Sequence, residues 1–137
     1  MEKGIPATWP RVAYLCTYPP RKCGIAAFTY ELTTAIDRYT NPLAPATLIA
    51  VNDEESGYNY GPRVRYQLKD DEVSSYLEAA EAINDSQIDL VNVQHEYGIF
   101  GGRHGEYLLV FLKGVRKPVV TTMHTVLPDP PCKGSDR

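Results

Sequence analysis

Five short apolar runs, separated by segments with helical spacing, restrict this chain to a small set of folds. We interpret the runs as strands at residues 11–16, 47–51, 64–68, 88–93 and 119–123. Apolar side chains recur with helical spacing between several of these runs. The order β-α-β-β-α-β-α-β calls for parallel strands joined by helical crossovers. The sequence therefore predicts an α/β fold: a doubly wound, mainly parallel Rossmann-like sheet of about five strands with helices on both faces.

The expected helices have start and stop signals. The first begins at Gly24 and ends before Asn41-Pro42, the second is capped by Asp70 or Asp71, and the third runs from about residue 105 to a stop at Gly114. The side chains expected to face the sheet are Ile25, Phe28, Leu32, Ile36 and Tyr39 in the first helix and Val73, Tyr76, Leu77, Ala80 and Ile83 in the second.

The length of 137 residues predicts one domain. We divide the chain into a flexible N-terminal segment (1–10), a Rossmann-like domain (11–126) and an irregular tail (127–137). Only the fourteen residues 124–137 follow the last strand, and they contain no helical pattern that would cover it. We therefore expect the domain to be truncated, a piece of something longer.

Charge and cysteine content narrow the function classes. A net charge of -3 gives no reason to expect a nucleic acid as partner. The three cysteines form no CxxC pair, which favours free thiols and a reducing compartment. The sequence has neither a signal-peptide core nor the roughly 18 consecutive apolar residues of a membrane span. We expect a cytoplasmic protein.

The loop after the first strand, residues 17–24, leads into a helix N-terminus, where free N–H groups favour anions. Gly24 would let the backbone approach a phosphate closely, with Arg21 and Lys22 as neighbouring cations. The loop is neither a G-x-G-x-x-G nor a Walker A sequence. The alternative is a plain turn that needs a flexible residue.

The nonapeptide QHEYGIFGG, residues 94–102, follows the buried run 88–93 at the edge where open α/β sheets bind ligands. Mixed hydrogen-bond donors and acceptors beside an aromatic ring suit a hydroxyl-rich sugar. The groups that would form such a pocket are those of Gln94, His95, Glu96 and Tyr97.

Two other interpretations of this segment stay open. His95 and Glu96 would also serve to satisfy backbone groups around a tight glycine turn. Together with His104 and Glu106 they would supply nitrogen and oxygen ligands for a metal, but the spacing matches no standard zinc motif. We therefore assign no metal ligands.

His124 ends the fifth run and reaches the same edge of the sheet, which favours a role in binding a ligand. A nucleophile pair of Cys23 with His95 or with His124 is an alternative. No Asn or Asp stands out to orient such a pair, so cysteine-based hydrolysis is disfavoured.

Together these segments resemble the N-terminal domain of a GT-B, family 4 retaining glycosyltransferase. The motifs are YPPRKCGIA from Tyr18, QHEYGIFGG from Gln94 and HTVLPDP from His124, in that order and on the expected elements. The resemblance covers about residues 11–130, nearly the whole chain.

The resemblance implies transfer of a sugar from a nucleotide-sugar to a carbohydrate or other hydroxyl acceptor, with retention of configuration and without a metal or other cofactor. Gly24, with Arg21 and Lys22, would face the donor diphosphate, and His124 would contact the donor sugar as the catalytic residue. The residues of the acceptor side would be Gln94, His95, Glu96 and Tyr97.

The sequence also departs from the family pattern. Such enzymes bind the nucleotide mainly through a second, C-terminal Rossmann-like domain, which these residues do not contain, and many have a glycine pair where this chain has Gly24 alone. We expect the isolated chain to be inactive, and the full-length enzyme to be open to peripheral membrane contact. The alternatives are a non-catalytic α/β sugar- or phosphate-binding module, and a truncated product that associates through its fifth strand.

Overall fold

The computed structural model describes residues 9–40 and 42–128. Expectations for the remaining residues, including Cys132 and most of the two terminal segments, lie outside the described residues. The elements in chain order are β1 (Val12–Cys16), α1 (Gly24–Tyr39), β2 (Thr47–Asn52), β3 (Val64–Lys69), α2 (Val73–Asn84), β4 (Leu90–His95), the 3-10 turn η1 (Arg103–Gly105), α3 (Leu108–Gly114) and β5 (Val119–Met123).

The five strands form one parallel sheet in the order β3-β2-β1-β4-β5. In the centre, Leu15 of β1 pairs with Ile49 of β2 on one side and with Val93 of β4 on the other. The predicted doubly wound α/β fold is confirmed. The chain builds the sheet outward from β1 in both directions, so the carboxyl ends of β1 and β4 frame a topological switch point.

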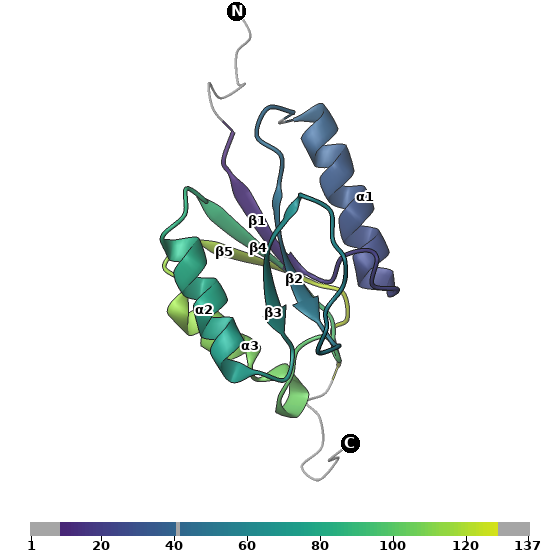
Figure 1. Ribbon diagram of the computed structural model, residues 1–137, viewed down its shortest axis with the longest axis vertical. Helices are drawn as coiled ribbons and strands as arrows, with labels where there is room; N and C mark the ends of the chain where they lie inside the picture. Colours follow the sequence, from purple (N-terminus) through teal and green to yellow (C-terminus); the bar gives the residue numbers. More distant parts are fainter. Residues whose placement is uncertain (1–8, 41, 129–137) are drawn as a thin grey trace, which may run out of the picture.

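The helices cover both faces of the sheet (Figure 1), with α1 on one face and α2 and α3 side by side on the other. The strand side chains alternate between two cores. Ala13 and Leu15 of β1 enter the larger core, which includes Tyr76 of α2 and Phe111 of α3. The intervening Tyr14 and its neighbours form a smaller core beneath α1.

Helix α1 meets the sheet through only part of the apolar face that the sequence predicted. The partly buried Leu32 and Ile36 pack against the smaller core. Ala26, Thr29 and Thr33 are its buried residues. Phe28 and Tyr39 are 45% and 76% exposed, so their assignment to the packed face was wrong. Helical periodicity identifies the helix, but the position of the strands beneath it decides which side is covered.

The start of α2 also differs from the prediction. Its N-cap is Glu72, whose side chain makes no capping hydrogen bond, so the assignment of Asp70 or Asp71 as the cap was wrong. The Ser75 hydroxyl stabilises this turn instead, because it accepts the Lys69 N–H at 3.0 Å and donates to the Glu72 carbonyl at 2.7 Å.

Two further boundaries bear on the site. Strand β4 continues to His95, two residues beyond the predicted end, and α3 begins at Leu108 because residues 103–105 form the separate turn η1.

In the described part of the chain, the structure contains no helix with the length and apolar character needed to cross a membrane.

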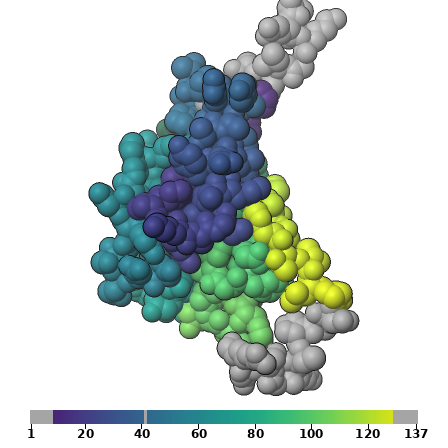
Figure 2. Space-filling view, turned by 90° about the vertical axis from the view of Figure 1, so that its right-hand side faces the viewer, coloured from purple at the N-terminus to yellow at the C-terminus, as the bar shows by residue number. Residues whose placement is uncertain are grey.

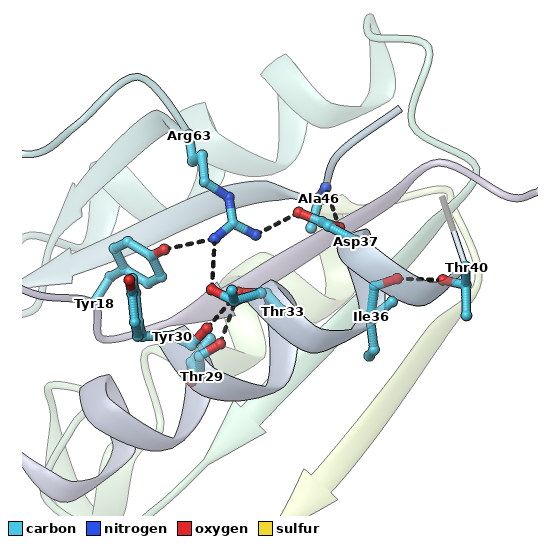
Figure 3. Close-up of polar contacts among 10 residues, drawn as sticks. Tyr18, Thr29, Tyr30, Thr33, Ile36, Asp37, Thr40, Ala46 and Arg63 are labelled. Atoms are coloured by element: carbon cyan, nitrogen blue, oxygen red, sulfur yellow. Dashed lines mark hydrogen bonds and ion pairs between the residues drawn. The ribbon is translucent and has the colours of Figure 1, made fainter. Parts of the chain in front are cut away.

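Arg63, just before β3, ties this part of the chain to α1 (Figure 3). Its guanidinium donates to the Asp37 carboxylate of α1 and, at 2.9 Å, to the Tyr18 hydroxyl. Asp37 also accepts the backbone N–H of Ala46 at 2.9 Å, just before β2. The side chains of Arg63 and Asp37 are only 26% and 15% exposed, so this ion pair is partly shielded from water.

We expect Asp37→Asn to lower the free energy of unfolding by roughly 1–3 kcal/mol, because it leaves the half-buried Arg63 guanidinium without its charge partner. Urea denaturation would measure the change. Glu81→Gln removes an exposed carboxylate of α2 and should change stability by less than about 0.5 kcal/mol. Equal effects of the two substitutions would contradict a stabilising role for the Arg63–Asp37 pair.

Candidate functional site

Three segments converge at the carboxyl edge of the sheet. They follow β1, β4 and β5, and Figure 2 shows them in purple, green and yellow around the lower end of α1. A groove of about 360 Å³ separates the first two segments and is lined by residues 21, 23–25 and 96–99. The third segment joins this arrangement through Thr125, whose hydroxyl donates to Glu96 at 2.9 Å.

The first wall of the groove is the start of α1. Gly24 is the first residue of the helix, and a Cβ at this position would meet nothing within 4 Å. Cys23 caps the helix, since its Sγ accepts the Ala26 N–H at 3.4 Å and lies 2.9 Å from the hydroxyl of the buried Thr17. The positive end of the helix dipole therefore faces the groove, which favours a negatively charged group.

The two cations predicted to bind phosphate lie in different environments. The Arg21 guanidinium donates to the Val51 carbonyl at 2.9 Å and lies 3.6 Å from the Asp53 carboxylate. The Arg21 side chain is 11% exposed, so much of its charge is balanced by the end of β2. Lys22 is exposed and does not line the groove.

The four predicted acceptor-side residues separate into two pairs. Gln94 and His95 are the last residues of β4, not loop residues as expected, so their side chains leave opposite faces of the sheet. Gln94 is fully buried and offers no surface to a ligand. Glu96 and the 43%-exposed Tyr97 line the groove directly.

Glu96 presents an oriented carboxylate to the groove. One oxygen accepts the Thr125 hydroxyl, and the other accepts the Tyr97 N–H at 2.8 Å. The Thr125 bond, followed by the Tyr97 bond, holds the pKa of Glu96 below its usual range. An ionised carboxylate in this position attracts hydroxyl donors and repels anions.

His95 lies against the other side of the same segment. Its ring stacks on Phe100 at a centroid distance of 5.9 Å and meets the edge of Tyr97 at 5.2 Å. Its Nδ1 is buried and has no hydrogen-bond partner among the described residues. Burial lowers the pKa of His95, with His124 acting in the same direction and Glu96 opposing it. The structure therefore favours a neutral imidazole.

His124, the predicted catalytic residue, is not among the residues that line the groove. It directly precedes Thr125 and is held on two sides. Its Nε2 is 2.7 Å from the Gln94 Oε1, and its ring meets Phe28 of α1 edge to face at a centroid distance of 4.8 Å. The backbone N–H of His124 donates to the His95 carbonyl at 3.0 Å, so the chain stays aligned with β4 just past β5.

The described residues also bear on the two alternatives, a metal site and a cysteine nucleophile. Within residues 9–40 and 42–128, no three His, Cys, Asp or Glu side chains converge as a metal site requires. His104 lies within the η1 turn and Glu106 directly follows it, where the Glu106 carboxylate accepts the Arg103 N–H at 3.3 Å. Cys16 and Cys23 are free thiols, and the Cys23 Sγ bonds Thr17 and the helix backbone.

Sequence reasoning missed several residues that build the site. Asn92 and Thr122 bind the Gln94 side chain, while Thr125 binds Glu96 and Phe28 packs on His124. Asn92 had a detectable signal, since it alternates with valines in an otherwise buried run, which predicts a polar stripe on one face of the strand. The others are recognisable only from their neighbours in space.

Comparison with protein-family models, curated proteins and solved structures found no match for this chain. The function of the groove is therefore inferred from its own residues and from the resemblance of the three sequence motifs to those of family 4 glycosyltransferases.

The glycines around the groove should differ in their tolerance of a side chain. A Cβ on Gly101 would lie 1.9 Å from the Asp70 carbonyl oxygen, whereas one on Gly24 would enter open space. We expect Gly101→Ala to lower the free energy of unfolding by about 1–3 kcal/mol or more, and Gly24→Ala to leave it unchanged or slightly raised. Thermal and urea denaturation would measure both. A loss of stability in Gly24→Ala would mean that Gly24 serves the fold.

His95 should make stability depend on pH. Its pKa in the folded protein lies below the ordinary 6.5, so its contribution is complete above about pH 6.5 and is lost as the pH falls through the folded pKa. We expect unfolding free energies measured between pH 7 and about pH 5 to fall more steeply for the wild type than for His95→Gln or His95→Phe. Parallel profiles for all three proteins would contradict this assignment.

Proposed function

We propose that this chain is the acceptor-side domain of a retaining glycosyltransferase of the GT-B, family 4 type. In this proposal the protein takes part in moving a sugar from a nucleotide-sugar to a hydroxyl of a carbohydrate or other acceptor. The observation that carries the proposal is that the three resembling segments meet at the switch point of the sheet: two of them line one groove, and the third bonds Glu96 of that groove.

The groove has groups suited to each part of such a reaction. The start of α1 at Gly24 offers backbone N–H groups and a positive dipole to a diphosphate leaving group. The Glu96 carboxylate is oriented to accept hydrogen bonds from sugar hydroxyls, and the exposed ring of Tyr97 offers a surface on which a sugar ring packs. His124 contacts Phe28 of α1 and the buried Gln94 of β4, and it precedes Thr125, which bonds Glu96.

The same groove is incomplete for binding a nucleotide. The Arg21 charge is largely engaged by Val51 and Asp53, and Glu96 adds a negative charge to the opposite wall. In our proposal a second Rossmann-like domain supplies most of the nucleotide contacts and closes the cleft. The isolated chain then binds ligands weakly and transfers no sugar.

We expect titration of the ¹⁵N-labelled chain with UDP-glucose or GDP-mannose to shift the amide signals of Gly24, Ile25 and residues 96–98. Gly24→Ala should weaken this response, because the added Cβ enters the groove. The matched control is Gly61→Ala, since a Cβ at Gly61 also meets nothing within 4 Å but lies outside the groove.

Three results would count against the proposal. The first is that no nucleotide-sugar or simple glycoside shifts these amides. The second is that Gly24→Ala and Gly61→Ala behave alike. The third is tight nucleotide-sugar binding by the isolated chain, which would favour a stand-alone binding module.

A further inference from the structure

Gln94 is the largest fully buried polar side chain near the groove, and all of its amide is engaged. It lies in β4 between β1 and β5, and its relative exposure is 0%. Its Nε2 donates to the Asn92 Oδ1 and, at 3.3 Å, to the Thr122 Oγ1. Its Oε1 lies 2.7 Å from the Nε2 of His124.

The partners of Gln94 determine which way its amide points. In the structure the Asn92 Oδ1 faces Gln94, and the Asn92 Nδ2 lies 3.5 Å from the Thr122 hydroxyl. A carbonyl oxygen can only accept, and therefore the NH₂ group of Gln94 must face Asn92. A flipped Gln94 amide would bring two acceptors together in a buried site, which is unfavourable.

This orientation also fixes the histidine. The Oε1 of Gln94 faces His124 and can only accept a hydrogen bond, so the His124 Nε2 must carry a proton. In the neutral imidazole the other ring nitrogen, Nδ1, is then an acceptor with a free lone pair. The edge-to-face contact with Phe28 restricts the ring on another side.

We propose that Gln94 is a positioning residue that holds His124 in the Nε2–H tautomer, so that Nδ1 accepts a hydrogen bond from a ligand hydroxyl. The tautomer follows from the orientations of the Asn92 and Gln94 amides, whereas the hydroxyl ligand rests on the proposed function. Gln94 then acts on the ligand through His124, without touching it.

The proposal has a chemical consequence for the ligand. An unprotonated Nδ1 attracts a hydrogen-bond donor and offers nothing to a phosphate oxygen, which is itself an acceptor. The nearby Glu96 carboxylate has the same preference. This side of the groove is therefore suited to sugar hydroxyls, and the start of α1 is the part suited to a charged group.

Long-range ¹H–¹⁵N NMR of the chain labelled with ¹⁵N-histidine tests the tautomer directly. At about pH 8, where an ordinary imidazole is neutral, we expect a protonated Nε2 and an unprotonated Nδ1 for His124. Assignment is straightforward because the described part contains only two other histidines, His95 and His104. A protonated Nδ1 in the wild-type protein would overturn the proposal, whatever the chain binds.

Variants of Gln94 test whether this residue is the cause. Gln94→Leu removes the acceptor and should give a mixture of the two tautomers. Gln94→Glu keeps an oxygen facing His124 and should keep the Nε2–H form, with the Asn92 amide turned so that its NH₂ group donates to the second carboxylate oxygen. Thr125→Val is the control, because Thr125 adjoins His124 but bonds Glu96. An Nε2–H form unchanged in Gln94→Leu would overturn the proposal. If Gln94→Leu does not fold, the wild-type tautomer and Gln94→Glu still decide it.

Binding of methyl α-glucopyranoside separates this proposal from the proposed function. We expect Gln94→Leu to bind it about fivefold to tenfold more weakly than the wild type and Gln94→Glu to retain most of the affinity, as expected for one hydrogen bond. Equal affinities of the wild type and Gln94→Leu would overturn the positioning role while leaving the sugar site intact. If the wild type binds no sugar at all, the proposed function and the hydroxyl ligand are overturned. The assignment of the His124 tautomer then still stands.

Discussion

The parallel pairing of β1 with both β2 and β4 is the constraint on which the remaining structure depends. Because these strands run the same way, their carboxyl ends meet at one edge of the sheet. The chain crosses over to opposite faces on the two sides of β1, which leaves a crevice between the loops after β1 and β4. The start of α1 and the segment from Glu96 to Ile99 become the walls of a groove for this reason.

The site consists of an exposed layer and a buried layer that holds it. The groove presents Gly24, Glu96 and Tyr97, whereas Gln94 lies behind them and bonds both β5 and His124. A buried amide is unfavourable unless its hydrogen bonds are satisfied, so the network of Gln94 is restricted to very few arrangements. Because Gln94 also bonds His124, the same network restricts the orientation of the His124 ring.

The distribution of charge gives the two sides of the groove different preferences. Arg21 is turned toward Val51 and Asp53, and Glu96 is kept ionised by its hydrogen bonds. The helix dipole at the start of α1 is thus the main feature that favours an anion, while the opposite wall favours hydroxyl groups. In the proposed function the hydroxyl-binding wall takes the sugar, and most nucleotide contacts are left to a second domain.

The sequence by itself determined the fold class, because short apolar runs and helical spacing are local patterns that a parallel sheet must satisfy. It also identified the three segments that meet at the groove. Only the tertiary structure decided that Phe28 contacts His124 instead of the core, and that Gln94 is a buried support. The physical reason is that these roles depend on contacts between residues about 30 positions apart or more, such as Gln94 with His124. Strand register and helix placement set such contacts, and no local periodicity encodes them.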